Sequence, residues 1–107
     1  MNMPSPVKAY FDADRNRDAR ALAAAFAADA TVKDEGNTYA GREAIEAWWS
    51  EAKAKYEPVA APLEVEGQGE AVKVLAEVTG NFPGSPVKLT FAFRLAGARI
   101  EHLEITQ

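Results

Sequence analysis

The hydrophobic period of this chain changes once, at about Pro62, and that change limits the possible folds more than any other feature. Before it, apolar residues recur every three to four positions, as on one face of a helix. After it, apolar and polar residues alternate, as on a strand with one buried face. Helices first and strands afterwards predict an α+β fold in which helices pack on one face of a sheet.

Three helices are predicted before the change. The first follows Pro4 and Pro6 and ends at the polar run 14–17, and its inner face carries apolar residues at i, i+3 and i+4: Val7, Tyr10 and Phe11. Asp18 is the expected N-cap of a second helix with Leu22 and Phe26 on its inner face. The third follows Gly41 and is closed by Pro58 and Pro62, with these residues at helical spacing: Ile45, Trp48, Trp49, Ala52 and Tyr56.

Strand patterns account for most of the remaining chain. Residues 30–41 predict a short hairpin whose turn is Glu35-Gly36-Asn37. Alternating segments then predict antiparallel strands at 63–66, 72–78, 87–95 and 99–105, with a turn-rich connection at 80–86. We therefore expect three N-terminal helices packed on an antiparallel sheet.

Length and composition fit a single small domain, 1–107. A chain of 107 residues, 48% hydrophobic and 26% charged, has room for one core and the balance of an ordinary globular protein. No apolar run approaches the roughly 18 residues of a membrane span, and the N-terminus does not resemble a secretory signal. We expect a cytoplasmic protein that does not interact with membranes.

Charge and residue content exclude several classes of function. The net charge is −4 and the basic residues are scattered, so no stripe for binding nucleic acid is expected. One histidine and no cysteine leave few ligands for zinc and exclude a thiolate nucleophile. We therefore expect no metal and no cofactor.

A composite pattern between Val7 and Trp49 resembles the nuclear transport factor 2-like superfamily, and within it the SnoaL-like and ketosteroid isomerase-like proteins. It comprises a helix with a central aromatic, a second helix ending in Phe26, the segment DATVKD at 29–34 and the segment YAGREAI at 39–45. The resemblance implies a cone-shaped, cystatin-like α+β barrel, in which a bent sheet wraps around helices and encloses a ligand cavity. It also implies homodimers that pair through the outer face of the sheet.

The resemblance assigns roles to two residues. Asp34 falls where ketosteroid isomerases place their general base, and Tyr10 falls where they place a tyrosine that donates a hydrogen bond to the developing enolate. The second donor of those enzymes, a protonated aspartic acid, would fall near Phe91, and no acidic residue occurs between Glu77 and Glu101. The resemblance therefore implies the base and one hydrogen-bond donor of that proton-transfer site, without the second donor.

Each of these residues also has a structural interpretation. Asp34 could bond the backbone amides of its own hairpin, and Tyr10 could be a core aromatic. Trp48 and Trp49 lie about 100° apart on a helix, so we expect only one to point squarely inward. The same question of core or cavity wall applies to the other residues predicted to line the pocket: Phe26, Val32, Tyr39, Tyr56, Phe82, Phe91 and Phe93.

His102 is the only side chain whose ordinary pKa lies near neutrality. Strand alternation with Leu103 places it on the face of Ile100 and Glu104, and the sequence does not show whether that face is concave. His102 therefore has two interpretations, a pocket residue or a structural one.

Three functions are compatible with these features. The first is proton transfer on a small apolar carbonyl compound, in an isomerase, cyclase or dehydratase with Asp34 as base and Tyr10 as donor. The second is a cofactor-free module that binds a small hydrophobic ligand. The third is a dimeric interaction domain that uses its sheet face.

Overall fold

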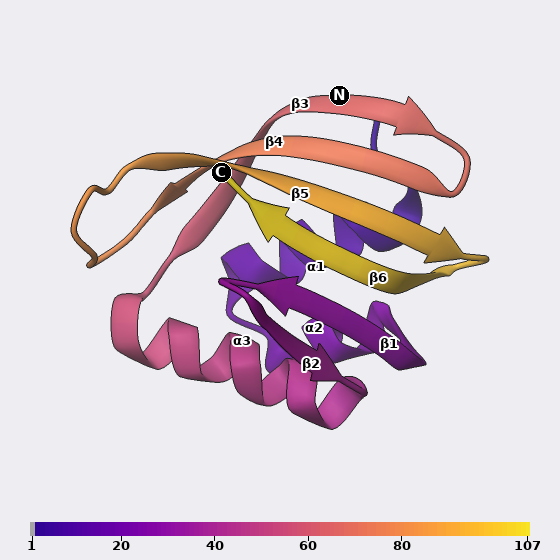
Figure 1. Cartoon of the computed structure of the whole chain (residues 1–107), viewed down its shortest axis with the longest axis horizontal. Helices are drawn as coiled ribbons and strands as arrows, with labels where there is room; N and C mark the ends of the chain where they lie inside the picture. The colour runs from indigo at the N-terminus through magenta and orange to yellow at the C-terminus, as the bar shows by residue number, and fades with distance from the viewer. Residues whose placement is uncertain (1) are drawn as a thin grey trace.

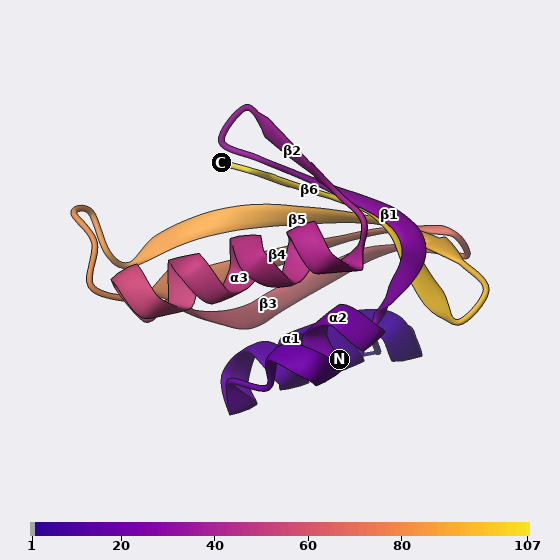
Figure 2. The ribbon, with the colours of Figure 1, turned by 90° about the horizontal axis from the view of Figure 1, so that it is seen from below.

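Within the described part of the chain, six strands form one curved sheet with three helices packed on its inner side. A computed structural model describes residues 2–107. Figure 1 shows the sheet in front and the helices behind and below it, and Figure 2 shows α1 and α2 on one side of the sheet. The helices are α1 Ser5–Asn16, α2 Ala19–Ala24 and α3 Arg42–Tyr56. The strands are β1 Phe26–Asp34, β2 Asn37–Ala40, β3 Val59–Gln68, β4 Ala71–Thr79, β5 Val87–Ala96 and β6 Arg99–Thr106.

The helix ends follow from local chemistry. Proline stands next to the start of α1, where no amide hydrogen bond is lost. Asp18 caps α2 as predicted, accepting a hydrogen bond of 3.0 Å from the amide of Ala21. The polar run at 14–17 was expected to end the first helix, but α1 continues through Asp14, which is buried. The helix ends only at its C-cap Arg17, whose φ is 55°.

The α+β class and the curved sheet are confirmed, and the sheet differs from the prediction in two respects. Its strand order is β2-β1-β6-β5-β4-β3, so the sheet is open between β2 and β3 and does not close into a barrel. It is also mixed, because β1 runs parallel to β6 while the other neighbours are antiparallel. A period of two shows which face a residue occupies but not the direction of the neighbouring strand.

Two element boundaries also differ. Phe26 was expected on the inner face of the second helix; instead α2 ends at Ala24 and Phe26 begins β1, opposite Ile100. Its side chain still reaches the core, where it is fully buried, so apolar spacing could not separate the two possibilities. β3 begins at Val59, before Pro62, because an edge strand with a register shift next to Pro62 tolerates proline.

The core lies between the inner face of the sheet and the helices. The inward residues of β4 and β5 pack against aromatic and aliphatic side chains of α1, among them Val7, Tyr10 and Phe11. At the C-terminal end of α3, the loop 80–86 docks on the helix through a bond of 2.6 Å from the Asn81 amide to the Tyr56 carbonyl. None of the helices in residues 2–107 has the length and hydropathy needed to span a membrane.

Candidate functional site

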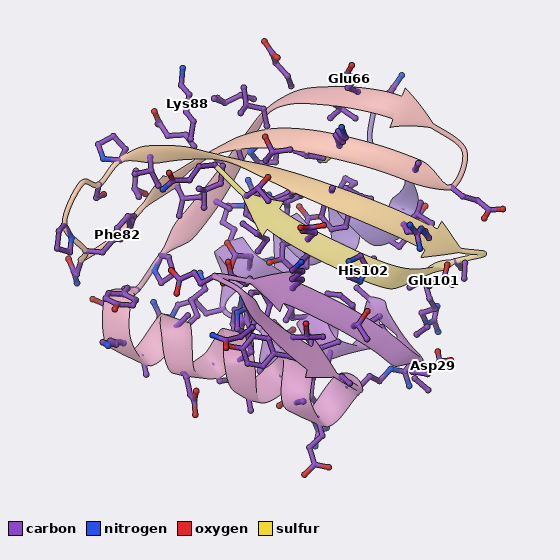
Figure 3. All side chains as sticks on the ribbon, in the orientation of Figure 1. Asp29, Glu66, Phe82, Lys88, Glu101 and His102 are labelled. Carbon is purple, nitrogen blue, oxygen red and sulfur yellow. The ribbon has the colours of Figure 1, made fainter. Side chains whose placement is uncertain are left out.

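A cavity of about 380 Å³ opens between the inner face of the sheet, α1 and α3. This volume falls within the range of small-molecule sites. The loop 80–86 forms one of its walls, and Figure 3 shows Phe82 on this loop, near the end of α3. Seven of the residues predicted for the site line it: Tyr10, Asp34, Trp48, Trp49, Tyr56, Phe82 and Phe91.

Ten further residues line the same cavity. Most are apolar side chains on the inward-facing positions of strands or on the loop, and two are acidic: Asp14, Glu35, Pro58, Ala60, Val78, Pro83, Val87, Leu89, Ile105 and Gln107. Asp14 was detectable in principle, because it lies one helical turn after Tyr10 and therefore on the same face of α1.

Asp34 stands at the end of β1, where strand alternation turns its side chain toward the cavity beside Ile105. Burial raises the pKa of its carboxyl above the ordinary value of 3.8, and the neighbouring charge of Glu35 adds to the increase. The indole Nε1 of Trp48 donates a hydrogen bond of 3.1 Å to Asp34 Oδ2, which offsets part of that pKa shift. Asp34 is thus a half-buried carboxyl whose proton affinity is raised and which keeps access to the cavity.

Tyr10 lines the deeper part of the cavity from α1. Its side chain is only 3% exposed, and its ring packs edge-on against Phe11 at 5.2 Å and Phe93 at 5.6 Å. Burial and the charges of Asp14 and Asp34 hold the pKa of its hydroxyl well above 10, so the group stays protonated. Across residues 2–107 no hydrogen bond occupies this hydroxyl, and no fully buried polar atom lacks a partner, so the hydroxyl faces the open cavity.

A buried ion pair supports the floor of the cavity. Asp14 Oδ1 accepts bonds from Trp49 Nε1 at 2.9 Å and from Lys53 Nζ at 3.0 Å, and Asp14 Oδ2 accepts the Ala60 amide at 3.0 Å. Lys53 also donates to the carbonyl of Pro58, and both charged side chains are almost fully buried. Asp14, Lys53 and their partners therefore join α1, α3 and β3, and we call them the Asp14–Lys53 clamp.

Four apolar residues predicted for the pocket lie outside its lining. Phe26, Val32 and Phe93 are buried in the core, where Phe26 and Phe93 contact the ring of Tyr10. Tyr39 lies on β2 with its ring 6.0 Å from that of Trp48, so it supports a wall residue. Both tryptophans line the cavity, in place of the single inward indole expected, because Trp48 faces Asp34 and Trp49 faces Asp14.

His102 lies on the outer face of the sheet, away from the cavity. The register between β5 and β6 shifts next to Leu95, so Ile100 is buried while His102 points outward with Glu104. A bulge of this kind reverses the alternation on which the prediction relied. The imidazole Nδ1 of His102 lies 2.6 Å from the Thr31 hydroxyl, and Figure 3 shows the histidine on the side of the sheet that has no helices.

Among residues 2–107, no three His, Cys, Asp or Glu side chains gather closely enough to hold a metal ion. What the arrangement offers is acid–base chemistry: a carboxyl of raised pKa, a protonated phenol and an apolar aromatic wall.

Comparison with known proteins assigns this architecture to a family. The family model described as the SnoaL-like domain matches residues 7–103, which is nearly the whole chain. The chain belongs to the SnoaL-like domain family. A comparison of the sequence with curated proteins gives no match.

Two solved structures that share more than a quarter of their residues with this SnoaL-like chain have the same fold. A candidate polyketide cyclase from Sinorhizobium meliloti is 47% identical with a TM-score of 0.94, over 97% of this chain and 95% of that one. A protein of ketosteroid isomerase-like fold from Catenulispora acidiphila, in complex with trimethylamine, is 26% identical with a TM-score of 0.87, over 99% of this chain and 87% of that one.

A third structure supports the fold alone. An uncharacterised protein of cystatin fold from Novosphingobium aromaticivorans is 17% identical with a TM-score of 0.81, over 99% of this chain and 100% of that one. The resemblance seen in the sequence is therefore confirmed at the level of family and fold. A fold of this kind does not by itself specify an activity.

Proposed function

We propose that this SnoaL-like chain binds a small, largely apolar carbonyl compound in the cavity and catalyses proton transfer within it. The observation that carries the proposal is that a carboxyl of raised pKa and an unoccupied phenol share one aromatic cavity. The 47% identity to a candidate polyketide cyclase supports the same class of chemistry.

In the proposed reaction, ionised Asp34 removes a proton from the carbon next to the carbonyl group. The electron pair of that C–H bond moves into the carbonyl, and the negative charge develops on its oxygen. Tyr10 donates a hydrogen bond to this oxygen and stabilises the enolate. Protonated Asp34 then returns the proton to a different carbon in an isomerisation. In a cyclisation the enolate carbon attacks a second carbonyl group, whose π electrons move to its oxygen, and protonated Asp34 gives its proton to that alkoxide.

The test is solvent exchange. We expect the protein in D₂O to incorporate deuterium next to the carbonyl group in members of a panel of cyclic enones and β-diketones, followed by NMR. Asp34→Asn should lower this rate at least about a hundredfold, which is the usual scale for loss of a general base. Asp29→Asn is the matched control, because Asp29 is an exposed residue of the same strand outside the cavity lining.

Folding of both variants is checked by circular dichroism. Equal exchange in Asp34→Asn and Asp29→Asn would exclude Asp34 as the base. Tyr10→Phe tests the donor separately, since it should slow exchange while preserving the ring contacts in the core.

Binding without turnover is the second candidate function. Phe91, near which the resemblance places the second donor of the isomerases, contributes an aromatic ring to the wall and no hydrogen-bond donor. The relative from Catenulispora acidiphila is in complex with trimethylamine, which has no carbonyl group. A ligand that raises the melting temperature and is recovered unaltered would support this candidate.

We further propose that the protein forms a homodimer through the outer face of the sheet. The cytoplasmic location expected from the sequence stays a prediction, as do the absence of nucleic-acid partners and of a cofactor.

A further inference from the structure

Acidic side chains outnumber basic ones in the cavity lining. Among residues 2–107, the lining contains three carboxylates, those of Asp14, Asp34 and Glu35, and no lysine, arginine or histidine. The ammonium group of Lys53 lies beside this lining, but it is bound by Asp14 Oδ1 and the Pro58 carbonyl and is almost fully buried. Lys53 therefore balances the charge of Asp14, and among residues 2–107 no ion pair engages Asp34 or Glu35.

These two carboxylates lie beside each other at the exposed end of β1. Glu35 is exposed and Asp34 is half buried, and the charge of Glu35 raises the pKa of Asp34, so the pair repels. A positive charge placed between them and the cavity interior would relieve that repulsion. A negative charge in the same place would increase it.

Aromatic rings cover much of the remaining wall. Trp48, Trp49, Tyr56, Phe82 and Phe91 all contribute to it. The negative face of an aromatic ring attracts cations, and methyl groups on an ammonium nitrogen also fit an apolar surface. The protein already uses this attraction, since Lys53 Nζ lies 5.4 Å from the ring centroid of Trp49.

Tyr10 adds a polar atom within the cavity. Its side chain is 3% exposed, and across residues 2–107 no hydrogen bond occupies its hydroxyl. A ligand that carries a hydroxyl, carbonyl or N–H group beside its cationic part could bond this group. The cavity thus combines an anionic edge, aromatic walls and one free hydroxyl.

We infer that the cavity selects its ligand by charge, binding small methylated ammonium compounds in preference to neutral molecules of the same shape and excluding anions. The inference rests on the ligand pocket of the proposed function but not on proton transfer by Asp34. It goes beyond that function by naming a further ligand class for the same cavity: an organic cation whose methyl groups contact the rings and whose charge faces Asp34 and Glu35.

The experiment compares two probes of one shape. Choline and 3,3-dimethyl-1-butanol differ only in nitrogen or carbon at the centre of the trimethyl group, so their affinities isolate the effect of charge. By isothermal titration calorimetry at low salt, we expect choline to bind about tenfold more tightly than the neutral alcohol. A preference of this size is what a cation–π contact and a nearby carboxylate can supply. Pivalate, an anion with a similar apolar part, should not bind.

Variants identify the groups responsible. Asp34→Asn and Glu35→Gln should each reduce the ratio of the affinity for choline to the affinity for the neutral probe. Glu101→Gln removes the same charge from an exposed position of β6 outside the cavity lining and should leave the preference intact. Figure 3 shows Glu101 at the opposite end of β6 from the C-terminus.

The outcomes separate this inference from the proposed function. Equal affinity for choline and the neutral probe would overturn charge selection and leave the pocket standing. Binding of neither probe at millimolar concentration would overturn charge selection also, while deuterium exchange would still report on proton transfer. A choline preference unaffected by Asp34→Asn and Glu35→Gln would place the cation elsewhere and contradict the inference.

Discussion

At the scale of single residues, the two adjacent tryptophans give a direct test of how the Asp34 pKa is set. Trp48 donates a hydrogen bond to Asp34, which stabilises the ionised form and lowers the pKa, while burial raises it. Trp48→Phe removes the donor, so we expect the Asp34 pKa to move further above its ordinary value of 3.8. The measurement is the ¹³C chemical shift of the Asp34 carboxyl as a function of pH.

Trp49→Phe is the control for this titration. It removes an indole from the next position of α3, but that indole bonds Asp14. The Asp34 midpoint should therefore stay close to that of the unchanged protein. Identical midpoints in all three proteins would show that the Trp48 bond does not control the carboxyl.

Some cavity residues could be predicted from a sequence pattern, whereas the positions of others depend on contacts with residues far away in the sequence. Asp34 and Tyr10 were predicted as site residues through a pattern shared with a family, and both line the cavity. Asp14 was missed because its polarity suggested the end of a helix, whereas its burial depends on Lys53, which comes 39 positions later. His102 was left open because a bulge, which strand alternation does not reveal, decides the face it occupies.

At the scale of elements, the Asp14–Lys53 clamp holds α1, α3 and β3 in their positions around the cavity. Lys53→Met would leave the Asp14 carboxylate buried without its counter-charge. We expect this variant to lose about 3–5 kcal/mol of unfolding free energy, measured by urea denaturation. Replacing both partners by apolar residues, as in Asp14→Leu with Lys53→Met, should restore part of the loss because no charge then remains buried.

Lys55→Met provides the matched control on the same helix. Lys55 is exposed, with its ammonium group 5.0 Å from the Tyr56 ring centroid, and a contact of that kind contributes less than about 1 kcal/mol. Equal losses in the two variants would mean that the clamp does not stabilise the fold.

The elements themselves were largely predictable from the sequence, and their pairing was not. The hydrophobic period indicated the three helices and most of the strands, and Asp18 marked the start of α2. The parallel pair of β1 and β6 brings together segments about 70 residues apart, such as Thr31 and His102. No local pattern encodes such a contact, because it depends on how the intervening helix and strands cover the core.

At the scale of the whole molecule, no helix in residues 2–107 covers the outer face of the sheet, as Figures 1 and 2 show. Half-buried residues lie at its centre, among them Leu75, Thr90 and Ala92. Charged side chains of both signs surround them, and Lys33 and Glu104 approach within 4.0 Å. A two-fold partner would bury the centre and set opposite charges against each other, which is how self-complementary interfaces form.

The proposed homodimer makes a testable prediction about this face. We expect sedimentation equilibrium at tens of micromolar protein to give twice the mass of the chain. Leu75→Glu places a charge at the centre of the face and should shift the protein to monomers without unfolding it. Leu63→Glu is the control, because Leu63 is already 43% exposed, at the register shift of edge strand β3. A chain that stays monomeric before any substitution would contradict the homodimer while leaving the cavity, which one chain encloses by itself, unaffected.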